Sequence, residues 1–206
     1  TYGSSGETSW GPKLATPSTY DPLKFFHTGI VHNNAVDFSL GSAQNQTFVS
    51  FASTDSKGII PTNGYYRHNF MGRNTSDFSA SYILQGNQNM YSQGGWFNPL
   101  TSLYLFPRGD NFDELKAWER WNPSRKIHEQ YYPYVGNVSN GVVKENPYWN
   151  IYRQQFLEKR KRNMYSASLT YDALSWLNIS GRVRIDNTQG EGEMRAYATS
   201  DQSTGV

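Results

Sequence analysis

Hydrophobic and polar residues alternate along the C-terminal part of the chain. In residues 165–172 every second side chain is apolar or aromatic, and the side chains between them are Ser, Thr or Asp. The alternation resumes after a short connection, 173–176, and continues through residues 177–186. Because successive side chains of a strand point to opposite faces, this pattern predicts two amphipathic strands that form an antiparallel hairpin.

The polar face of this predicted hairpin carries four charged residues: Asp172, Arg182, Arg184 and Asp186. In a soluble sheet such a face meets solvent, whereas in a large transmembrane barrel it lines the lumen and the apolar face meets lipid. The second strand alternates for about ten residues, the length of a tilted transmembrane strand. Tyr171 and Trp176, near the short turn, fit the aromatic belt of a membrane interface. The alternation alone favours a soluble β-sandwich, since soluble sheets are commoner, and leaves the barrel open.

A second hairpin is predicted earlier in the chain. Strands are expected at residues 36–40 and 49–51, joined by a polar turn, and a longer polar loop leads to another strand at 66–78. Short turns on one side and longer loops on the other are typical of outer-membrane barrels. The last of these strands runs into a further alternating stretch, 80–84, without turn residues between them. Antiparallel neighbours need a turn, so this stretch is either one very long strand or lacks residues between Phe78 and Ser79, and we favour missing residues.

The stretch from about residue 86 to 163 is a long insertion rich in aromatic and turn-forming residues. So long an insertion is usually functional or disordered, and its aromatic content indicates that it is folded. A short helix is expected near residues 112–118, with Asp110 or Asn111 as its cap. We expect most of the aromatic side chains to form a small core and a few to contact a sugar or peptide. The candidates for such contacts are Trp96, Phe97, Trp118, Trp121, Tyr148 and Trp149.

Composition narrows the classes of function. Aromatic residues make up 16% of the 206 residues although the chain is polar on average, so a disordered chain is a poor explanation. No run approaches the ~20 apolar residues of a transmembrane helix. A polar, aromatic-rich chain fits a β-sandwich, a carbohydrate-binding surface or a transmembrane barrel, in which alternation keeps the mean hydropathy low.

Charge and candidate chemistry exclude further classes. The net charge is only +2, whereas a nucleic-acid-binding protein needs a clustered basic face. No nucleic-acid partner is therefore predicted. Cysteine is absent and the four histidines are scattered, so neither a metal site, a cofactor nor a catalytic centre is predicted. The charged run 158–162 is interpreted as a solvated strand end; the alternative is contact with anionic lipid sugars or phosphates.

Several short stretches, spread in order over most of the chain, carry a further signal. They are 9–14 (SWGPKL), 22–29 (PLKFFHTG), 33–36 (NNAV), 53–61 (STDSKGIIP), 98–104 (NPLTSLY), 146–149 (NPYW) and 181–186 (GRVRID). In this order they resemble segments of the SusC/RagA family of TonB-dependent transporters from Bacteroidetes. The first is similar to the segment after the plug domain of that family, and the next two to its lead into the early barrel strands. This ordered resemblance favours the membrane barrel over the soluble sheet.

The resemblance implies an all-β fold, a transmembrane antiparallel β-barrel with long extracellular loops. This chain would be a portion of a plugged barrel of about 22 strands. Residues 1–30 would form the plug-to-barrel junction, and residues 31–206 the early strands with a long extracellular loop at about 86–163. Asp172, Arg182, Arg184 and Asp186 would face the lumen or contact the plug.

By the same resemblance, the whole protein would import oligosaccharides or oligopeptides across the bacterial outer membrane and would not be an enzyme. A SusD-like surface lipoprotein would cover the loops, and TonB would supply energy through a part of the chain not present here. Lipid of the outer membrane would surround the barrel. The alternative function is a soluble or surface-attached β-rich carbohydrate-binding module.

Overall fold

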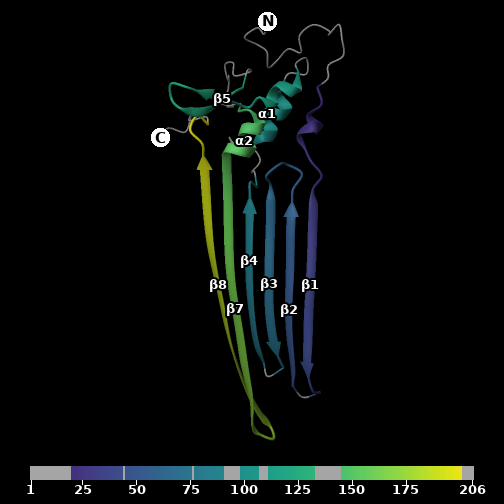
Figure 1. Ribbon diagram of the computed structural model, residues 1–206. Coiled ribbons are helices and arrows are strands. Elements are labelled where there is room, and N and C mark those ends of the chain that lie inside the picture. The colour runs from purple at the N-terminus through teal and green to yellow at the C-terminus, as the bar shows by residue number, and fades with distance from the viewer. Residues whose placement is uncertain are drawn as a thin grey trace.

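The computed structural model describes residues 20–43, 45–75, 77–90, 98–106, 111–132 and 145–200. It consists of a six-stranded antiparallel sheet with a small folded cap at one end of the strands (Figure 1). Each strand pairs with its neighbours in chain order, so the sheet is a meander. In order across the sheet the strands are β1 (Ile30–Gly41), β2 (Gln46–Lys57), β3 (Gly64–Asn74), β4 (Phe78–Gln88), β7 (Gln154–Leu174) and β8 (Leu177–Ala196).

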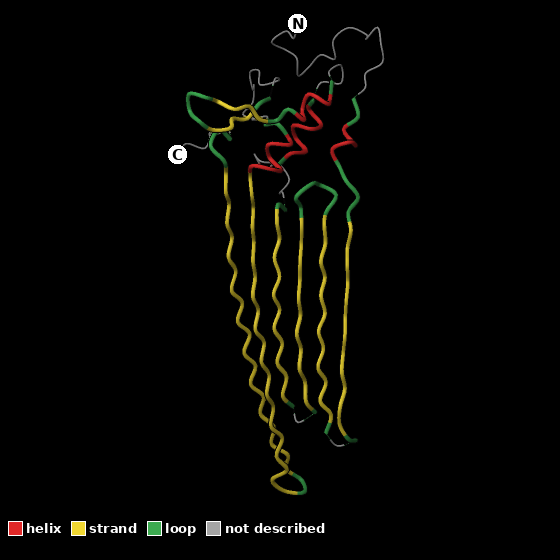
Figure 2. The backbone as a smooth tube through the Cα atoms, in the orientation of Figure 1, coloured by secondary structure: helices red, strands yellow, loops and turns green. Residues whose placement is uncertain are grey.

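The connections differ between the two ends of the sheet. Residues 42–45, 75–77 and 175–176 make short turns at the end far from the cap, which we call the turn end. At the cap end the connections are residues 58–63 and the long segment 89–153. Figure 2 shows this asymmetry, and also shows the β7–β8 hairpin reaching beyond the other turns. The short-turn and long-loop sides predicted from the sequence are confirmed.

The predicted gap between Phe78 and Ser79 is wrong. β3 ends at Asn74 and β4 begins at Phe78, so a tight turn joins the two strands without any missing residue. Asp77 adopts a left-handed backbone with φ of 63°, which its short polar side chain tolerates. The Asp77 carbonyl accepts a hydrogen bond from the Ser168 amide at 2.9 Å. Because this turn contains no glycine, its residues were assigned to a strand that continued to Phe78.

The predicted end of the long loop, near residue 163, is also wrong. β7 begins at Gln154, so the charged run 158–162 lies inside a strand that pairs with both β4 and β8. The run carries charges on both faces, and therefore lacks the apolar alternation by which a strand is recognised. Main-chain pairing on both sides holds it extended without any apolar face.

The cap is built from short elements of the long connection together with the segment before β1. These elements are η1 (Pro22–Phe25), α1 (Pro99–Leu105), η2 (Phe112–Lys116), β5 (Glu119–Asn122), β6 (Ile127–Gln130) and α2 (Pro147–Arg153). The short helix predicted at 112–118 is confirmed in part: it is the 3-10 helix η2 with Asn111 as its cap, but it ends at Lys116 and does not include Trp118. Both α1 and α2 follow an Asn-Pro pair, in which Asn caps the helix and Pro occupies its first turn. No described helix is both long enough and apolar enough to cross a membrane.

The core of the cap is aromatic and aliphatic. Its buried members are Phe25, Leu103, Phe106, Phe112, Leu115, Tyr132 and Ile151. Phe25 comes from the segment before β1, so that segment packs into the same core as the long connection. Tyr20 adds a stacked contact to Phe106, with ring centroids 5.9 Å apart. The described part of the long connection is therefore folded, as its aromatic content predicted.

Candidate functional site

The strand register gathers the apolar side chains of all six strands on one face of the sheet. Directly opposed residues of antiparallel strands carry their side chains on the same face. One such row runs Phe38, Val49, Gly72, Ala80, Tyr165 and Ile185 across the sheet. The apolar face comprises Val36, Phe38, Leu40, Val49, Phe51, Phe70, Phe78, Ala80, Tyr82, Tyr165, Leu169, Tyr171, Ile179, Val183 and Ile185.

This apolar face is open in the described structure. Leu169 is 75% exposed, and Phe38 and Val183 are each 65% exposed. Soluble monomers rarely expose contiguous apolar patches larger than a few hundred Å². The face therefore needs a covering, which can be lipid, a second sheet or another protein.

The apolar face forms a band of limited height. On β7 it extends from Tyr165 to Leu174, near the turn. Nine rises of about 3.3 Å give about 30 Å along the strand, and a tilt of about 40° reduces this to about 23 Å. The apolar belt of an outer-membrane barrel is about 25 Å tall. Beyond Tyr165, toward the cap, the same face of β7 continues with Asn163, Lys161 and Lys159.

The predicted interface aromatics lie at the turn end of this band. Tyr171 is on the apolar face and is 65% exposed. Trp176 is in the β7–β8 turn and is 78% exposed. Both indole and phenol rings combine an apolar body with a polar tip, which suits the boundary between an apolar layer and water.

The four predicted charged residues share the opposite face, which we call the polar face. Pairing of Asp172 with Asn178 and of Met164 with Asp186 places the even-numbered residues of both strands on it. Asp186 accepts a hydrogen bond of 2.9 Å from Nε of Arg162, a residue that was assigned to the loop. Asp172 accepts a hydrogen bond from the Asn178 amide. Arg182 and Arg184 are exposed on the same face.

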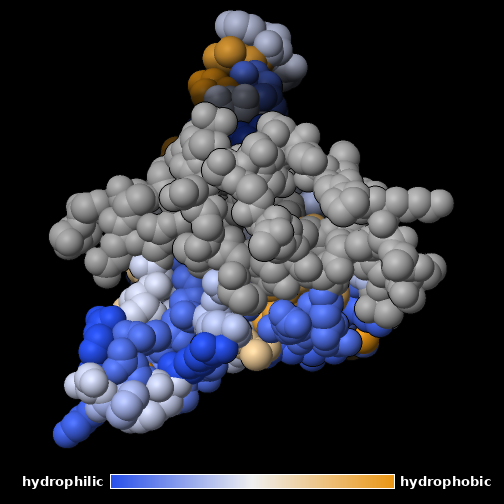
Figure 3. All heavy atoms as spheres, turned by 90° about the horizontal axis from the view of Figure 1, so that it is seen from above, coloured by the Kyte–Doolittle hydropathy of each residue, from blue (hydrophilic) through white to orange (hydrophobic). Residues whose placement is uncertain are grey.

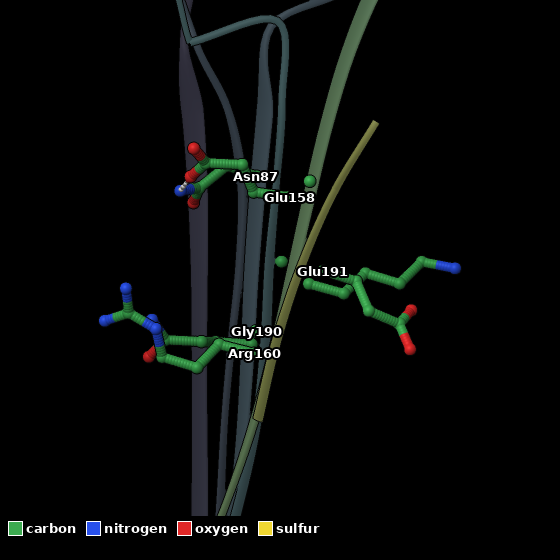
Figure 4. Close-up of a pocket in the computed structure, with 9 residues that line it drawn as sticks. Asn87, Glu158, Arg160, Gly190 and Glu191 are labelled. Carbon is green, nitrogen blue, oxygen red and sulfur yellow. Dashed lines mark hydrogen bonds between the residues drawn. The ribbon is translucent and has the colours of Figure 1, made fainter. Parts of the chain in front are cut away.

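A shallow groove of about 260 Å³ lies at the cap end of the polar face, across β4, β7 and β8. Arg160 faces Gly190 and Glu158 faces Gly192, and these glycines leave the β8 side of the groove without side chains. Glu158 accepts a hydrogen bond of 3.1 Å from the Asn87 amide. In Figure 4 Asn87, Glu158 and Arg160 point to one side of the sheet and Glu191 to the other. The groove offers charged and amide groups to a polar ligand or to another segment.

The cap aromatics divide between core and surface. Trp149 is fully buried and donates a hydrogen bond of 2.9 Å from its indole to Ser200, so its ring is part of the interior of the cap and does not face a ligand. Tyr148 packs against Phe25 with ring centroids 5.3 Å apart, and burial raises the pKa of the Tyr148 phenol. Trp121 is 55% exposed and meets His128 edge-on. Trp96 and Phe97 lie outside the described residues.

Trp118 belongs to a surface cluster that the sequence did not reveal. Arg153 donates two hydrogen bonds to Glu119 Oε2, at 3.0 Å from Nε and 2.6 Å from a terminal nitrogen. The same guanidinium lies 4.7 Å from the ring centre of Tyr197 and 5.5 Å from that of Trp118. Tyr152 adds a ring 5.4 Å from Trp118 and is 47% exposed.

This cluster offers stacking rings beside a fixed charge pair, which suits a sugar or a peptide side chain. In the sequence only the Asn146-Pro147 pair points toward this cluster, because it predicts the start of the helix that carries Tyr152 and Arg153. Among the described atoms visible from the cap end in Figure 3, hydrophilic ones predominate on one side of the view, and hydrophobic ones gather at the opposite edge. Among the described residues, no group of three or more His, Asp or Glu side chains is placed to hold a metal ion.

Comparison with models of known protein families finds none that matches this chain, and comparison with curated proteins finds no match either.

Proposed function

We propose that this chain forms part of a transmembrane β-barrel in the bacterial outer membrane. The whole protein would be a TonB-dependent transporter of the SusC/RagA type that imports oligosaccharides or oligopeptides. A SusD-like lipoprotein would act as its lid, and TonB would supply energy. The observation that carries the proposal is the exposed apolar face, which runs across all six strands and opposes a charged face. The ordered resemblance of the sequence segments supports the same function.

The height and limits of the apolar band favour lipid over a second sheet as its covering. The band on β7 matches the thickness of an outer-membrane belt, at about 23 Å after tilt. β7 and β8 then continue toward the cap with charged residues on both faces, as Lys159 and Arg160 illustrate. A second sheet packed on the apolar face would bury one of these charges at a high cost. A strand that leaves the bilayer exposes both charges to water.

The chain lacks cysteine, which allows a clean test of this topology. Single cysteines at Leu169 and Val183 test the apolar face, and single cysteines at Thr170 and Arg182 are the matched positions on the polar face. Each variant of the full protein is spin-labelled and reconstituted into phosphatidylcholine vesicles. We expect labels at 169 and 183 to collide with oxygen and to be shielded from a water-soluble nickel chelate, with the reverse at 170 and 182. Equal access of the chelate to all four positions would overturn the membrane assignment.

Transport requires a separate experiment. The gene is deleted, and uptake of labelled glycans and peptides is measured with and without a protonophore, because TonB draws on the proton gradient. We expect deletion to abolish uptake of one class, and the protonophore to have the same effect on the parent strain. Unchanged uptake of every glycan and peptide tested would contradict transport.

The alternative is a soluble or surface-attached carbohydrate-binding module, which the exposed rings of Trp121 and Tyr152 favour. Such a module would remain monodisperse in buffer without detergent and would lose glycan affinity in Trp121→Ala or Tyr152→Ala. The barrel predicts aggregation without detergent, because the apolar face is then exposed to water.

A further inference from the structure

The charged run 158–162 is divided by the pleat of β7 into two different surfaces. Lys159 and Lys161 lie on the same face as the apolar band, opposite Gly86 and Leu84 of β4. Arg160 and Arg162 lie on the polar face, where Arg160 lines the groove and Arg162 bonds Asp186. Of the four consecutive basic residues in this run, only the two lysines therefore lie beside the apolar band.

The backbone of both lysines lies beyond the polar headgroup layer, and Lys161 is the nearer of the two. Lys161 precedes Tyr165, the last apolar residue of the band, by four positions in the chain. This separation is about 13 Å along the strand and about 10 Å in height at a tilt of about 40°. The polar layer of one leaflet is about 5–8 Å thick. A lysine side chain can bend toward the interface, so its ammonium reaches this layer from that height. Lys159 is one pleat higher, at about 15 Å, so its ammonium comes only near the outer edge of this layer.

The surroundings leave both ammonium groups available to an anion. Neither lysine forms an ion pair with a described residue. Lys161 has Gln189 opposite on β8, and Asn163 and Asn187 form the next pair toward the band, so amides and no carboxylate border it there. Gly86, opposite Lys159, carries no side chain, and the ring of Tyr66 lies over it. The nearest acid across the strands is Glu191, the partner of Lys159.

We infer that Lys161 and Lys159 bind the phosphate of an anionic membrane lipid in the leaflet at the cap end of the sheet. The inference rests on the proposed function, since it requires the apolar band to lie in a bilayer. Lys161 is the main contact, because it is nearer the band and faces the amide of Gln189, whereas Lys159 faces Glu191 and adds to the site at longer reach. The occupant is a lipid because the apolar residues Tyr165 and Tyr82 continue below the lysines, where acyl chains would pack.

The test is a titration of the detergent-solubilised full protein with phosphatidylglycerol, followed by native mass spectrometry, with phosphatidylcholine as the neutral reference. We expect Lys161→Gln to weaken the tightest phosphatidylglycerol site about fivefold, and the Lys159→Gln/Lys161→Gln pair to weaken it further, to about tenfold. Arg160→Gln is the matched control, because it removes one charge from the adjacent residue on the opposite face. We expect it to leave the site unchanged.

Some outcomes would overturn this inference without affecting the proposed function. They include equal weakening by Arg160→Gln and equal affinity of the unaltered protein for both lipids. Full displacement of phosphatidylglycerol by millimolar inorganic phosphate would assign the lysines to a soluble anion and would also overturn it. Circular dichroism of each variant verifies that the sheet is intact. Failure of the proposed function is distinct, because the protein would then stay monodisperse without detergent and bind neither lipid.

Discussion

Asn146 is the residue whose loss should damage the cap most. Its side chain is fully buried at the start of α2 and connects three segments of the cap. The amide nitrogen donates to the carbonyls of Leu115 at 2.9 Å and Tyr131 at 3.0 Å. The amide oxygen accepts from the Tyr148 backbone N–H at 2.9 Å and so caps the helix. Asn146→Ala removes all three bonds at once.

The magnitude follows from the groups that are left behind. Loss of the helix cap costs about 1 kcal/mol, and each buried carbonyl without its donor costs about 1–3 kcal/mol. We therefore expect the cap of Asn146→Ala to lose about 3–7 kcal/mol of local stability. Asn111→Ala is the matched control, because the exposed Asn111 caps η2 through a single acceptor bond to the Asp113 N–H. Its loss should cost about 1 kcal/mol or less.

Hydrogen exchange measures this local stability without unfolding the sheet. Since about 1.4 kcal/mol is a factor of ten, amides of α2 in Asn146→Ala should exchange at least about 100-fold faster than in the parent protein. Asn111→Ala should accelerate the amides of η2 by about fivefold. The amides of β2 serve as an internal reference and should not change. Equal acceleration by the two substitutions would refute the role of Asn146 as a connector. Asn146→Asp separates the functions, because it keeps the helix-capping acceptor and loses both donors.

Three further predictions concern the sheet, its junction with the cap, and pH. Gly86→Ala would place a Cβ 2.6 Å from the Tyr66 ring and should lower the free energy of unfolding by about 1–3 kcal/mol, measured with urea on the protein in vesicles. Gly72→Ala, with open space around its Cβ, should be near neutral. Asn89 has a left-handed backbone, donates a hydrogen bond to the Thr62 hydroxyl and accepts one from the Phe156 N–H. Asn89→Gly should lose only these hydrogen bonds, whereas Asn89→Ala should also strain the backbone and be less stable still. Hydrogen exchange of the amides in residues 58–63 measures the difference. Burial raises the pKa of Tyr132 above its ordinary value, so the folded cap keeps its proton where the unfolded chain loses it. The contribution of Tyr132 to the stability of the cap is therefore fully present below about pH 10 and is lost as pH rises further. Between about pH 9 and 11 the protease resistance of the parent protein should fall, and that of Tyr132→Phe should fall less steeply.

The hairpin of β7 and β8 could be predicted because its apolar alternation is unbroken over residues 165–186 apart from the turn. The shared face of Asp172, Arg182, Arg184 and Asp186 follows from the same period of two. The rest of β7 could not be predicted in this way. Its residues 154–163 have no apolar face to mark them, and only pairing with β4 and β8 makes them a strand.

The cap was predicted only as a folded loop with one short helix. The sequence indicates that helix through its cap, Asn111. Which aromatic side chains are buried depends instead on contacts between residues that are far apart in the chain. Trp149 lies under Ser200 and Tyr197, which come from the segment after β8. No local pattern contains that contact, so Trp149 and Trp121 are equivalent candidates from sequence alone.

The cap is fixed to the sheet by hydrogen bonds at two separate places. The Thr62 hydroxyl donates to the Ile151 carbonyl of α2 at 2.9 Å, and the His27 N–H donates to the Ile59 carbonyl at 2.9 Å. α2 also runs directly into β7 without a linker. A helix attached in this way cannot tilt without disturbing either the β2–β3 turn or the first residues of β7. The surface cluster of Trp118, Tyr152 and Arg153 is therefore held at a fixed position relative to the sheet, as a contact surface for a ligand or lid requires.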